Sequence, residues 1–582
     1  MKIFKDLWWF FKQEKRAYII GVIALVTVSL LSLIPARLIG KTVDAIADRS
    51  LTMGSFLTII ATLVVTAGIM YGLRYVWRAY IFGSSLRLER QMRNSLFKHL
   101  TNMSGSFFQK HRTGDLMAHA TNDLKSIQQV AGAGILTLAD SVLTGGMVIV
   151  TMATLINWKL TLIALLPMPL IAISSQFLGK KLHISFRDAQ SAFSDMNDYA
   201  QETIGGTKVT KTFGQEGAEI KHFQSQTNEV RKKNVIVARL DSAFDPAINI
   251  IVALSYALTL FGGAYLIRQS EITIGDLVSF ITYLGMLVWP MLAFGFLYNI
   301  LERGSASYDR VAILMANEAE VTDREGAVDV TPTGDITVDV EEVRYADDKL
   351  ALHNIHFKIG AGETLGIVGR TGAGKTTLVQ MLLRQVNHYE GLITIGGRDI
   401  KDYTLDSLRR SIGYVPQDQF LFSTTIRENI RFGRPEATQE EVEAVTRLTA
   451  IHDDIEAFTE GYDIVVGERG VSLSGGQKQR ISIARALLMN PELLILDDAL
   501  SAVDAKTEEA IVSALKETRS DKTTIICAHR LSSVQHSEQI LVLENGELAQ
   551  SGRHAELMLS DGWYSQIFEQ QQLVQASEGG EG

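Results

Sequence analysis

The sequence predicts a multi-domain protein in which a six-helix, all-α transmembrane domain is followed by an α/β domain. Six segments in the first 300 residues are long and apolar enough to cross a bilayer. The apolar periodicity stops after Glu318, where glycine, proline and acidic residues accumulate. Beyond that point short β-branched runs alternate with helical patterns, which is typical of a largely parallel sheet. At 582 residues the chain is also too long for a single core.

The six apolar segments define the expected membrane crossings. They run over Tyr18–Gly40, Phe56–Phe82, Gln129–Ile156, Leu160–Leu178, Pro246–Ile267 and Ile274–Ile300. A basic, aromatic leader over Lys2–Arg16 precedes the first segment, which is too long for the apolar core of a cleavable signal. We therefore expect an interfacial amphipathic leader followed by a retained membrane anchor.

The distribution of basic residues predicts the orientation in the membrane. The leader, the loop Ser84–Ser126 and the loop Gly179–Phe244 together carry 22 Lys and Arg, whereas the opposite turns carry few, among them Arg49 and Lys159. By the positive-inside rule, both long loops and both termini are cytoplasmic. The chain is thus expected to be a multi-pass protein of the cytoplasmic membrane, with its α/β domain in the cytoplasm.

The domain boundaries are predicted at residues 1–318 for the transmembrane domain, 319–335 for a linker, 336–570 for the α/β domain and 571–582 for a flexible polar tail. The two long loops keep helical spacing, so we expect helices that continue beyond the bilayer. A short segment near Lys208–Gln215 follows the turn at Gly205–Gly206 and is expected to dock on protein in the cytoplasm.

Charge and cysteine content exclude other classes of protein. Residues 1–318 carry 31 Lys and Arg against 22 Asp and Glu, a net +9, and the remainder carries 25 against 43, a net −18. The basic excess lies between apolar runs and not on a compact basic domain, so no nucleic-acid partner is expected. The single cysteine, Cys527, excludes an intrachain disulfide.

A phosphate-binding loop marks the second domain as an α/β P-loop nucleotide-binding domain. The strand Thr364–Val368 runs into the pattern G-x-x-x-x-G-K-[ST] and then into a helix. The predicted nucleotide-binding residues of this loop are Gly369, Arg370, Thr371, Gly372, Ala373, Gly374, Lys375, Thr376 and Thr377. Backbone N–H groups would wrap the phosphates, Lys375 would add a cation, and the Thr376 hydroxyl would ligate Mg²⁺. ATP and Mg²⁺ are therefore the predicted cofactors.

Further motifs follow in a fixed order. An apolar strand over Leu493–Leu496 ends in Asp497, which is expected to orient Mg²⁺. Between the two lies the pentapeptide Leu473–Gln477, LSGGQ, followed by a helical pattern. At these residues the chain resembles the ATP-binding cassette (ABC) family, whose signature is that pentapeptide, and the resemblance covers essentially the whole chain.

The resemblance implies roles for residues that mean little alone. It makes Tyr345 the adenine-stacking aromatic, Gln417 a sensor of Mg²⁺ and the membrane domain, Ser501–Asp504 the D-loop and His529 the switch histidine. It also implies that the segment Gly467–Gly470 touches the membrane domain. In this family two cassettes sandwich two nucleotides, so Ser474, Gly475, Gly476 and Gln477 would bind the nucleotide held by a second chain.

One departure from the family pattern concerns catalysis. The family places a catalytic Glu after the Mg²⁺-orienting Asp, whereas this chain has Asp498. The shorter side chain would hold its carboxylate about 1.5 Å back, and a misplacement of that size can cost about 10²-fold in rate. Asp498 beside an intact LSGGQ resembles the weak-site half of bacterial heterodimeric multidrug exporters of the type IV class, although a homodimer stays open.

The membrane half leaves the substrate open. The aromatic and methionine side chains of the sixth segment first indicate packing and lipid contact, and a substrate surface second. Asp140 in the third segment is costly in hydrocarbon, so it should face the protein interior or water. Export of a lipophilic small molecule is the expected function. The alternatives are an ATP-binding regulatory or gating subunit, or export of lipid or peptide.

Overall fold

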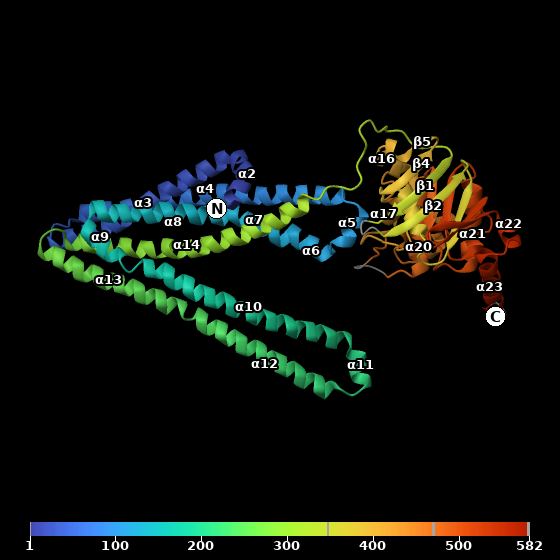
Figure 1. Ribbon diagram of the computed structural model, residues 1–582. Coiled ribbons are helices and arrows are strands. Elements are labelled where there is room, and N and C mark those ends of the chain that lie inside the picture. Colours follow the sequence, from blue (N-terminus) through green and yellow to red (C-terminus); the bar gives the residue numbers. More distant parts are fainter. Residues whose placement is uncertain (1, 346–348, 468–471, 579–582) are drawn as a thin grey trace. The chain divides into compact units, whose positions relative to one another are not determined.

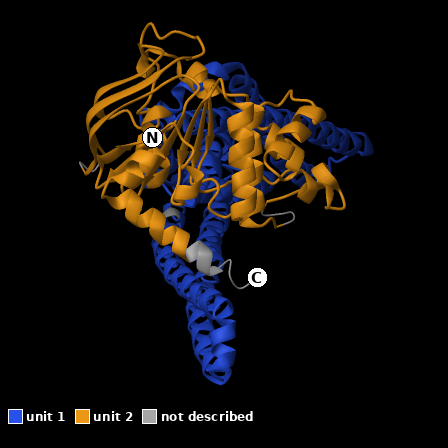
Figure 2. Cartoon of the chain, turned by 90° about the vertical axis from the view of Figure 1, so that its right-hand side faces the viewer, with its two compact units in different colours: residues 1–102, 110–318 blue, residues 103–109, 319–582 orange. Residues whose placement is uncertain are grey.

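Figure 1 shows the computed structural model, which describes residues 2–345, 349–467 and 472–578. The chain divides into two compact units, coloured separately in Figure 2. The helical unit comprises residues up to 102 and 110–318, and the α/β unit comprises residues 103–109 and those from 319 onward. The predicted fold class, an all-α transmembrane domain followed by an α/β P-loop domain, is confirmed.

The first 318 residues are helical almost throughout. Their elements are α1 (Lys2–Asp6), α2 (Trp8–Gln13), α3 (Lys15–Ala47), α4 (Met53–Thr101), α5 (Gly105–Lys110), α6 (Thr113–Ala118), the π-helix η1 (His119–Asp123), α7 (Leu124–Gln129), the π-helix η2 (Val130–Gly134), α8 (Ile135–Leu155), α9 (Trp158–Leu165), α10 (Pro169–Gly205), α11 (Thr207–Thr212), α12 (Glu216–Asp241), α13 (Phe244–Arg268) and α14 (Ile274–Met315). Within the described residues, six continuous helical stretches are long and apolar enough to span a membrane, as predicted.

The helices continue well beyond the apolar segments. α4 has 49 residues, a length of about 74 Å at about 1.5 Å per residue. The bilayer core needs only about 30 Å, so the long polar loops are helical as expected. α10 and α12 run side by side and are joined through the short helix α11 (Figure 1).

Small residues and proline shape the helical unit. A Cβ on Gly40 of α3 would lie 2.2 Å from the carbonyl oxygen of Gly275 in α14, so glycine at both positions lets these helices touch. Pro167 and Pro169 interrupt the fourth apolar segment, and α9 ends at Leu165 before α10 begins. A buried cluster of apolar side chains from α3, α8, α9 and α14 fills the space between these helices.

The α/β unit contains two sheets. Its strands are β1 (Ile336–Arg344), β2 (Leu350–Ile359), β3 (Thr364–Gly369), β4 (Tyr389–Ile395), β5 (Arg398–Asp399), β6 (Ile412–Val415), β7 (Leu493–Asp497), β8 (Thr523–Cys527), β9 (Gln539–Glu544) and β10 (Glu547–Gly552). The smaller sheet has the antiparallel order β2-β1-β4-β5, and the larger has the order β10-β9-β3-β8-β7-β6. Within the larger sheet only the β10–β9 pair is antiparallel.

Helices and short 3-10 turns complete this unit. They are α15 (Lys375–Leu382), η3 (Ile400–Asp402), α16 (Leu405–Ser411), α17 (Ile426–Arg431), α18 (Gln439–Leu448), α19 (His452–Glu456), η4 (Gly461–Asp463), α20 (Gly475–Leu488), α21 (Ala505–Thr518), η5 (Leu531–Ser533), α22 (His554–Leu559) and α23 (Trp563–Glu578). The elements from α17 to α20 enclose a core of their own, separate from the two cores around the sheets. The strands β3, β8, β7 and β6 are parallel neighbours, so their carboxyl ends meet at one edge.

Two boundary predictions differ from the structure. The stretch expected to be a linker is held on the α/β unit: Arg384 donates to the carbonyl oxygen of Thr322, and Arg324 pairs with Asp399 and Asp402. The tail expected to be flexible from Gln571 is instead helical, because α23 continues to Glu578. The polar sequence gives no helical pattern here, because the helix is held by contacts of Gln571 with the distant backbone of His529 and Leu531.

Candidate functional site

The phosphate loop joins β3 to α15 and owes its shape to glycine. Gly369, Gly372 and Gly374 have φ of 151°, 83° and 102°, values that disfavour any side chain. A Cβ on Gly369 would lie 2.2 Å from the carbonyl oxygen of Leu543 on β9. A Cβ on Gly374 would lie 2.3 Å from the Leu352 side chain. The loop therefore presents bare backbone at the start of a helix, the arrangement that binds phosphate.

Lys375 is buried at the centre of this loop. Its Nζ donates hydrogen bonds to the carbonyl oxygens of Gly369 at 2.8 Å and Arg370 at 3.2 Å. Burial lowers the pKa of Lys375, while the nearby Asp498 and Asp497 act in the opposite direction. Within the described residues this buried cation hydrogen-bonds to neutral carbonyl groups and to no carboxylate, which leaves room for an anionic partner.

Asp497 ends β7 and is almost fully buried at the same edge. The Tyr414 hydroxyl donates to it at 3.5 Å. Burial raises the pKa of Asp497, the charge of Asp498 adds to this effect, and the nearby Thr376 side chain acts in the opposite direction. Thr376 supplies a hydroxyl and Asp497 a carboxylate beside the phosphate loop. Both are oxygen ligands of the kind that Mg²⁺ binds.

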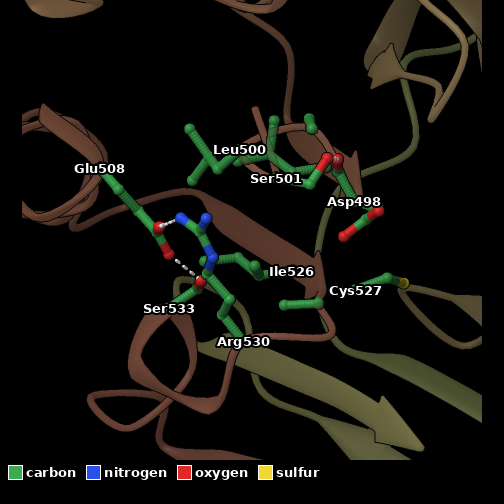
Figure 3. Close-up of a pocket in the computed structure, with 11 residues that line it drawn as sticks. Asp498, Leu500, Ser501, Glu508, Ile526, Cys527, Arg530 and Ser533 are labelled. Atoms are coloured by element: carbon green, nitrogen blue, oxygen red, sulfur yellow. Dashed lines mark hydrogen bonds and ion pairs between the residues drawn. The ribbon is translucent and has the colours of Figure 1, made fainter. Parts of the chain in front are cut away.

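Asp498 follows with a left-handed backbone, φ 50°, which Asp tolerates better than most residues. Its N–H donates to the carbonyl oxygen of Cys527 at 2.9 Å, so the ends of β7 and β8 are tied together. The Ser501 hydroxyl donates to the backbone carbonyl oxygen of Asp498 at 3.0 Å, and both residues line a small cavity (Figure 3). The shorter side chain is thus held on a fixed backbone.

The remaining predicted residues lie around this edge. Gln417 is exposed just after β6, whose Val415 pairs with Leu496 of β7. His529 is exposed two residues after β8. Tyr345 follows β1, and its hydroxyl lies 2.5 Å from the Thr377 side chain in α15. The carboxyl ends of neighbouring parallel strands therefore carry the phosphate loop, Asp497, Asp498, Gln417 and His529.

The signature residues are held elsewhere in the α/β unit. Ser474 caps α20 by accepting from the Gln477 N–H, and Gln477 in return accepts a hydrogen bond from the Ser474 N–H. A Cβ on Gly476 would lie 2.8 Å from the carbonyl oxygen of Ala502 in the D-loop. Among the described residues, no hydrogen bond or ion pair joins Ser474–Gln477 to the phosphate loop. The predicted segment Gly467–Gly470 extends outside the described residues.

Two groups of contacts near His529 were not predicted from the sequence. Glu508 on α21 is buried and binds the guanidinium of Arg530 at 3.0 Å and the hydroxyl of Ser533 (Figure 3). Arg530 also donates to the carbonyl oxygen of Val503 in the D-loop at 2.9 Å. Gln571 on α23 holds the backbone of His529 and Leu531. Each joins residues at least 20 positions apart, which periodicity and local motifs do not reveal.

The fold and site together define a class: a membrane domain of six spanning helices joined to a phosphate-loop nucleotide-binding domain is an ATP-driven transporter. The chain belongs to the ABC transporter family. The family described as the ABC transporter transmembrane region matches residues 18–291, and the family described as ABC transporter matches residues 352–501. The chain is accordingly a multi-pass membrane protein that binds and hydrolyses ATP.

Similar proteins agree with this assignment. The chain is 43% identical to the probable multidrug resistance ABC transporter ATP-binding/permease protein YheI of Bacillus subtilis, covering 100% of this chain and 99% of the relative. It is 43% identical to the multidrug resistance-like ATP-binding protein MdlA of Escherichia coli, covering 99% and 98%. A solved bacterial Atm1-family ABC exporter with ATP bound superposes with a TM-score of 0.79 at 30% identity, covering 96% of this chain and 99% of that one.

Proposed function

We propose that the chain is one half of an ATP-driven exporter of lipophilic compounds in the cytoplasmic membrane, assembled with a second ABC half-transporter. The observation that carries the proposal is the separation of the signature from the phosphate loop within one α/β unit. Each chain then holds half of two nucleotide sites, and a second chain completes both. The names of the multidrug resistance relatives support a lipophilic small-molecule substrate.

The proposed roles follow the geometry of the sheet edge. The phosphate-loop backbone and Lys375 bind the ATP phosphates, and Tyr345 stacks on adenine. Thr376, Asp497 and Gln417 hold Mg²⁺, which neutralises phosphate charge when bound. Among these, Thr376 in the phosphate loop and Asp497 at the end of β7 lie close enough for Thr376 to offset part of the rise in the pKa of Asp497 on burial, which supports their assignment. His529 and Asp498 serve hydrolysis, and Ser474–Gln477 serve the nucleotide of the partner chain.

The partner is proposed to be a different chain, because Asp498 stands where a competent site has Glu. The backbone of Asp498 is fixed by its bond to Cys527, so it has little freedom to advance the shorter carboxylate. This chain's own site then retains ATP and cleaves it slowly. Its complete LSGGQ serves a fast site built on the other chain.

The helix α11 supports mechanical coupling to the cytoplasmic α/β domains of the assembly. Three apolar side chains at this turn, Ile204, Val209 and Phe213, are each more than 60% exposed in the single chain. Exposed apolar groups at a hydrophilic helix tip favour a protein contact. The positive-inside rule places this tip, both termini and the nucleotide sites in the cytoplasm.

Transport in inverted membrane vesicles tests the proposal. Vesicles containing the chain and its partner are expected to accumulate a lipophilic dye on addition of ATP and Mg²⁺, and vesicles carrying Lys375→Ala in this chain should accumulate less. ATP binding with no accumulation of any lipophile, lipid or peptide would instead favour a regulatory or gating subunit, an alternative that Asp498 supports.

A further inference from the structure

Asp140 is a carboxylate inside a membrane-spanning helix. It lies on α8, 15 residues before the end of that helix at Leu155, which is a distance of about 22 Å along the axis. Because the hydrocarbon core of a bilayer is about 30 Å thick, this position is within the apolar region. A charged side chain there is costly unless a cation, water or polar groups surround it.

The two acidic residues in the predicted spans differ in their partners. Asp276, at the start of α14, pairs with Arg37 of α3 at 2.5 Å and also caps its own helix. Asp140 has no ion pair with any cation in the part of the chain that the structure describes. Its one hydrogen bond there is from Thr144, whose hydroxyl donates to Oδ1 at 2.8 Å.

Two hydroxyl groups, those of Ser29 and Thr144, lie in series next to this carboxylate. Ser29 of α3, which is buried, lies 2.7 Å from the Thr144 hydroxyl oxygen. The Ser29 hydroxyl also donates to the carbonyl oxygen of Leu25 in its own helix at 3.0 Å. With the Thr144 hydroxyl as its one hydrogen-bond partner among the described residues, the Asp140 carboxylate keeps most of its acceptor positions open.

Apolar surface lies on the adjoining helix. A Cβ on Gly145, the residue after Thr144, would lie 3.3 Å from the ring of Pro290, so α8 and α14 touch at this level. α14 carries Trp289 and Phe296, both more than half exposed in the single chain, with ring centroids 6.4 Å apart. A carboxylate on α8 and aromatic side chains on the helix that packs against it are suited to a ligand with an apolar body and one positive charge.

We propose that Asp140, supported by Thr144 and Ser29, binds the ammonium group of lipophilic cations and so sets the charge preference of the exporter. This inference rests on the proposed export function and names its substrate class. The carboxylate replaces the water that the ammonium loses on leaving the aqueous phase. A neutral molecule with the same apolar body gains nothing from this interaction.

The test uses two fluorescent compounds that differ by one charge: dansylcadaverine, an ammonium, and its neutral N-acetyl derivative. Uptake of each is measured in inverted vesicles containing the chain and its partner, and ATP-free binding is measured from dansyl fluorescence. Asp140→Asn should raise the KM and Kd of dansylcadaverine at least tenfold and leave those of the acetylated compound unchanged. Asp140→Glu, which keeps the charge, should retain the preference.

A matched pair of threonine variants tests the contribution of the Thr144 hydroxyl to binding. Thr144→Val should weaken dansylcadaverine binding severalfold. Thr154→Val, on the same helix, removes a hydroxyl that bonds only the carbonyl oxygen of Val150 and should have no effect. If Asp140→Asn raises the KM and Kd of both compounds equally, or of neither, the inference is wrong. The proposed export function is unaffected by either result. If the unaltered assembly accumulates neither these compounds nor any other lipophile, the export function itself fails and the inference with it; accumulation of neutral lipophiles without dansylcadaverine overturns the inference alone.

Discussion

The side-chain amide nitrogen of Gln571 lies 2.9 Å from the backbone carbonyl oxygen of His529. The Oε1 atom of the same side chain accepts from the Leu531 N–H at 2.9 Å. One glutamine on α23 thus holds the backbone on both sides of Arg530, next to the proposed switch histidine. The last described helix, α23, therefore helps to hold the backbone next to the proposed nucleotide site.

Gln571→Leu should disturb that support without unfolding the chain. The change removes two hydrogen bonds, each worth about 1 kcal/mol, and leaves the backbone after β8 freer to move. We expect ATP cleavage at this chain's own site, measured in a single turnover, to fall about threefold to tenfold. Gln570→Leu, at an exposed neighbour, is the control. Equal rates for the two variants would show that α23 does not position His529.

The attachment of α23 should weaken in acid. The hydroxyl of the fully buried Tyr564, whose pKa burial raises to about 12, stays protonated and lies 2.8 Å from Nδ1 of His554. Burial lowers the pKa of His554 from 6.5. The unfolded state therefore binds the proton more readily, and this stabilisation is present above pH 6.5 and lost as the pH falls through the lower folded pKa.

Hydrogen exchange measures this effect. Protection of the amides of Trp563–Glu578, corrected for intrinsic rates, should fall between about pH 7.5 and about pH 5.5. His554→Gln should remove most of the dependence, whereas His356→Gln, on an exposed strand of the other sheet, should retain it. A dependence that survives His554→Gln would assign it to another group.

The signature glycines should differ in their effect on stability. Alanine at Gly475 meets the Ala502 side chain at 3.4 Å, an ordinary contact, whereas alanine at Gly476 meets the Ala502 carbonyl oxygen at 2.8 Å. Gly476→Ala must displace the D-loop and should cost about 1–3 kcal/mol of unfolding free energy. Gly475→Ala should be neutral or slightly stabilising, because alanine favours helix. Thermal unfolding of the two variants separates them; a larger loss in Gly475→Ala would contradict the close approach of Gly476 to the D-loop.

The Lys375→Ala variant should lose nucleotide at this chain's own site. The change removes the cation at the centre of the phosphate loop, and charge-assisted bonds to phosphate are among the strongest polar contacts. Photolabelling of this chain by a reactive ATP analogue should fall at least about tenfold. Unchanged labelling would be inconsistent with the assigned site.

The sequence was most informative where local patterns fix the chemistry. Apolar length predicted the six spans, and the local patterns predicted that the phosphate loop with Lys375 follows one apolar strand and that Asp497 ends another. It was least informative where distant residues meet. The polar stretch after Gln571 gives no periodic signal, so its helix and its bonds to His529 were missed. The ion pair of buried Glu508 with Arg530 was missed for the same reason, since each residue looks like a surface charge in the sequence.

The central claim is that this chain supplies the slow nucleotide site and the signature of a fast one. The steady-state ATPase rate of the assembly with the partner, carrying Asp498→Asn in this chain, tests it most directly. Because the fast site keeps its own catalytic Glu, we expect the rate to fall by less than about threefold, whereas replacing that Glu in the partner should abolish turnover. Loss of all turnover in Asp498→Asn would contradict the division of labour between the two sites.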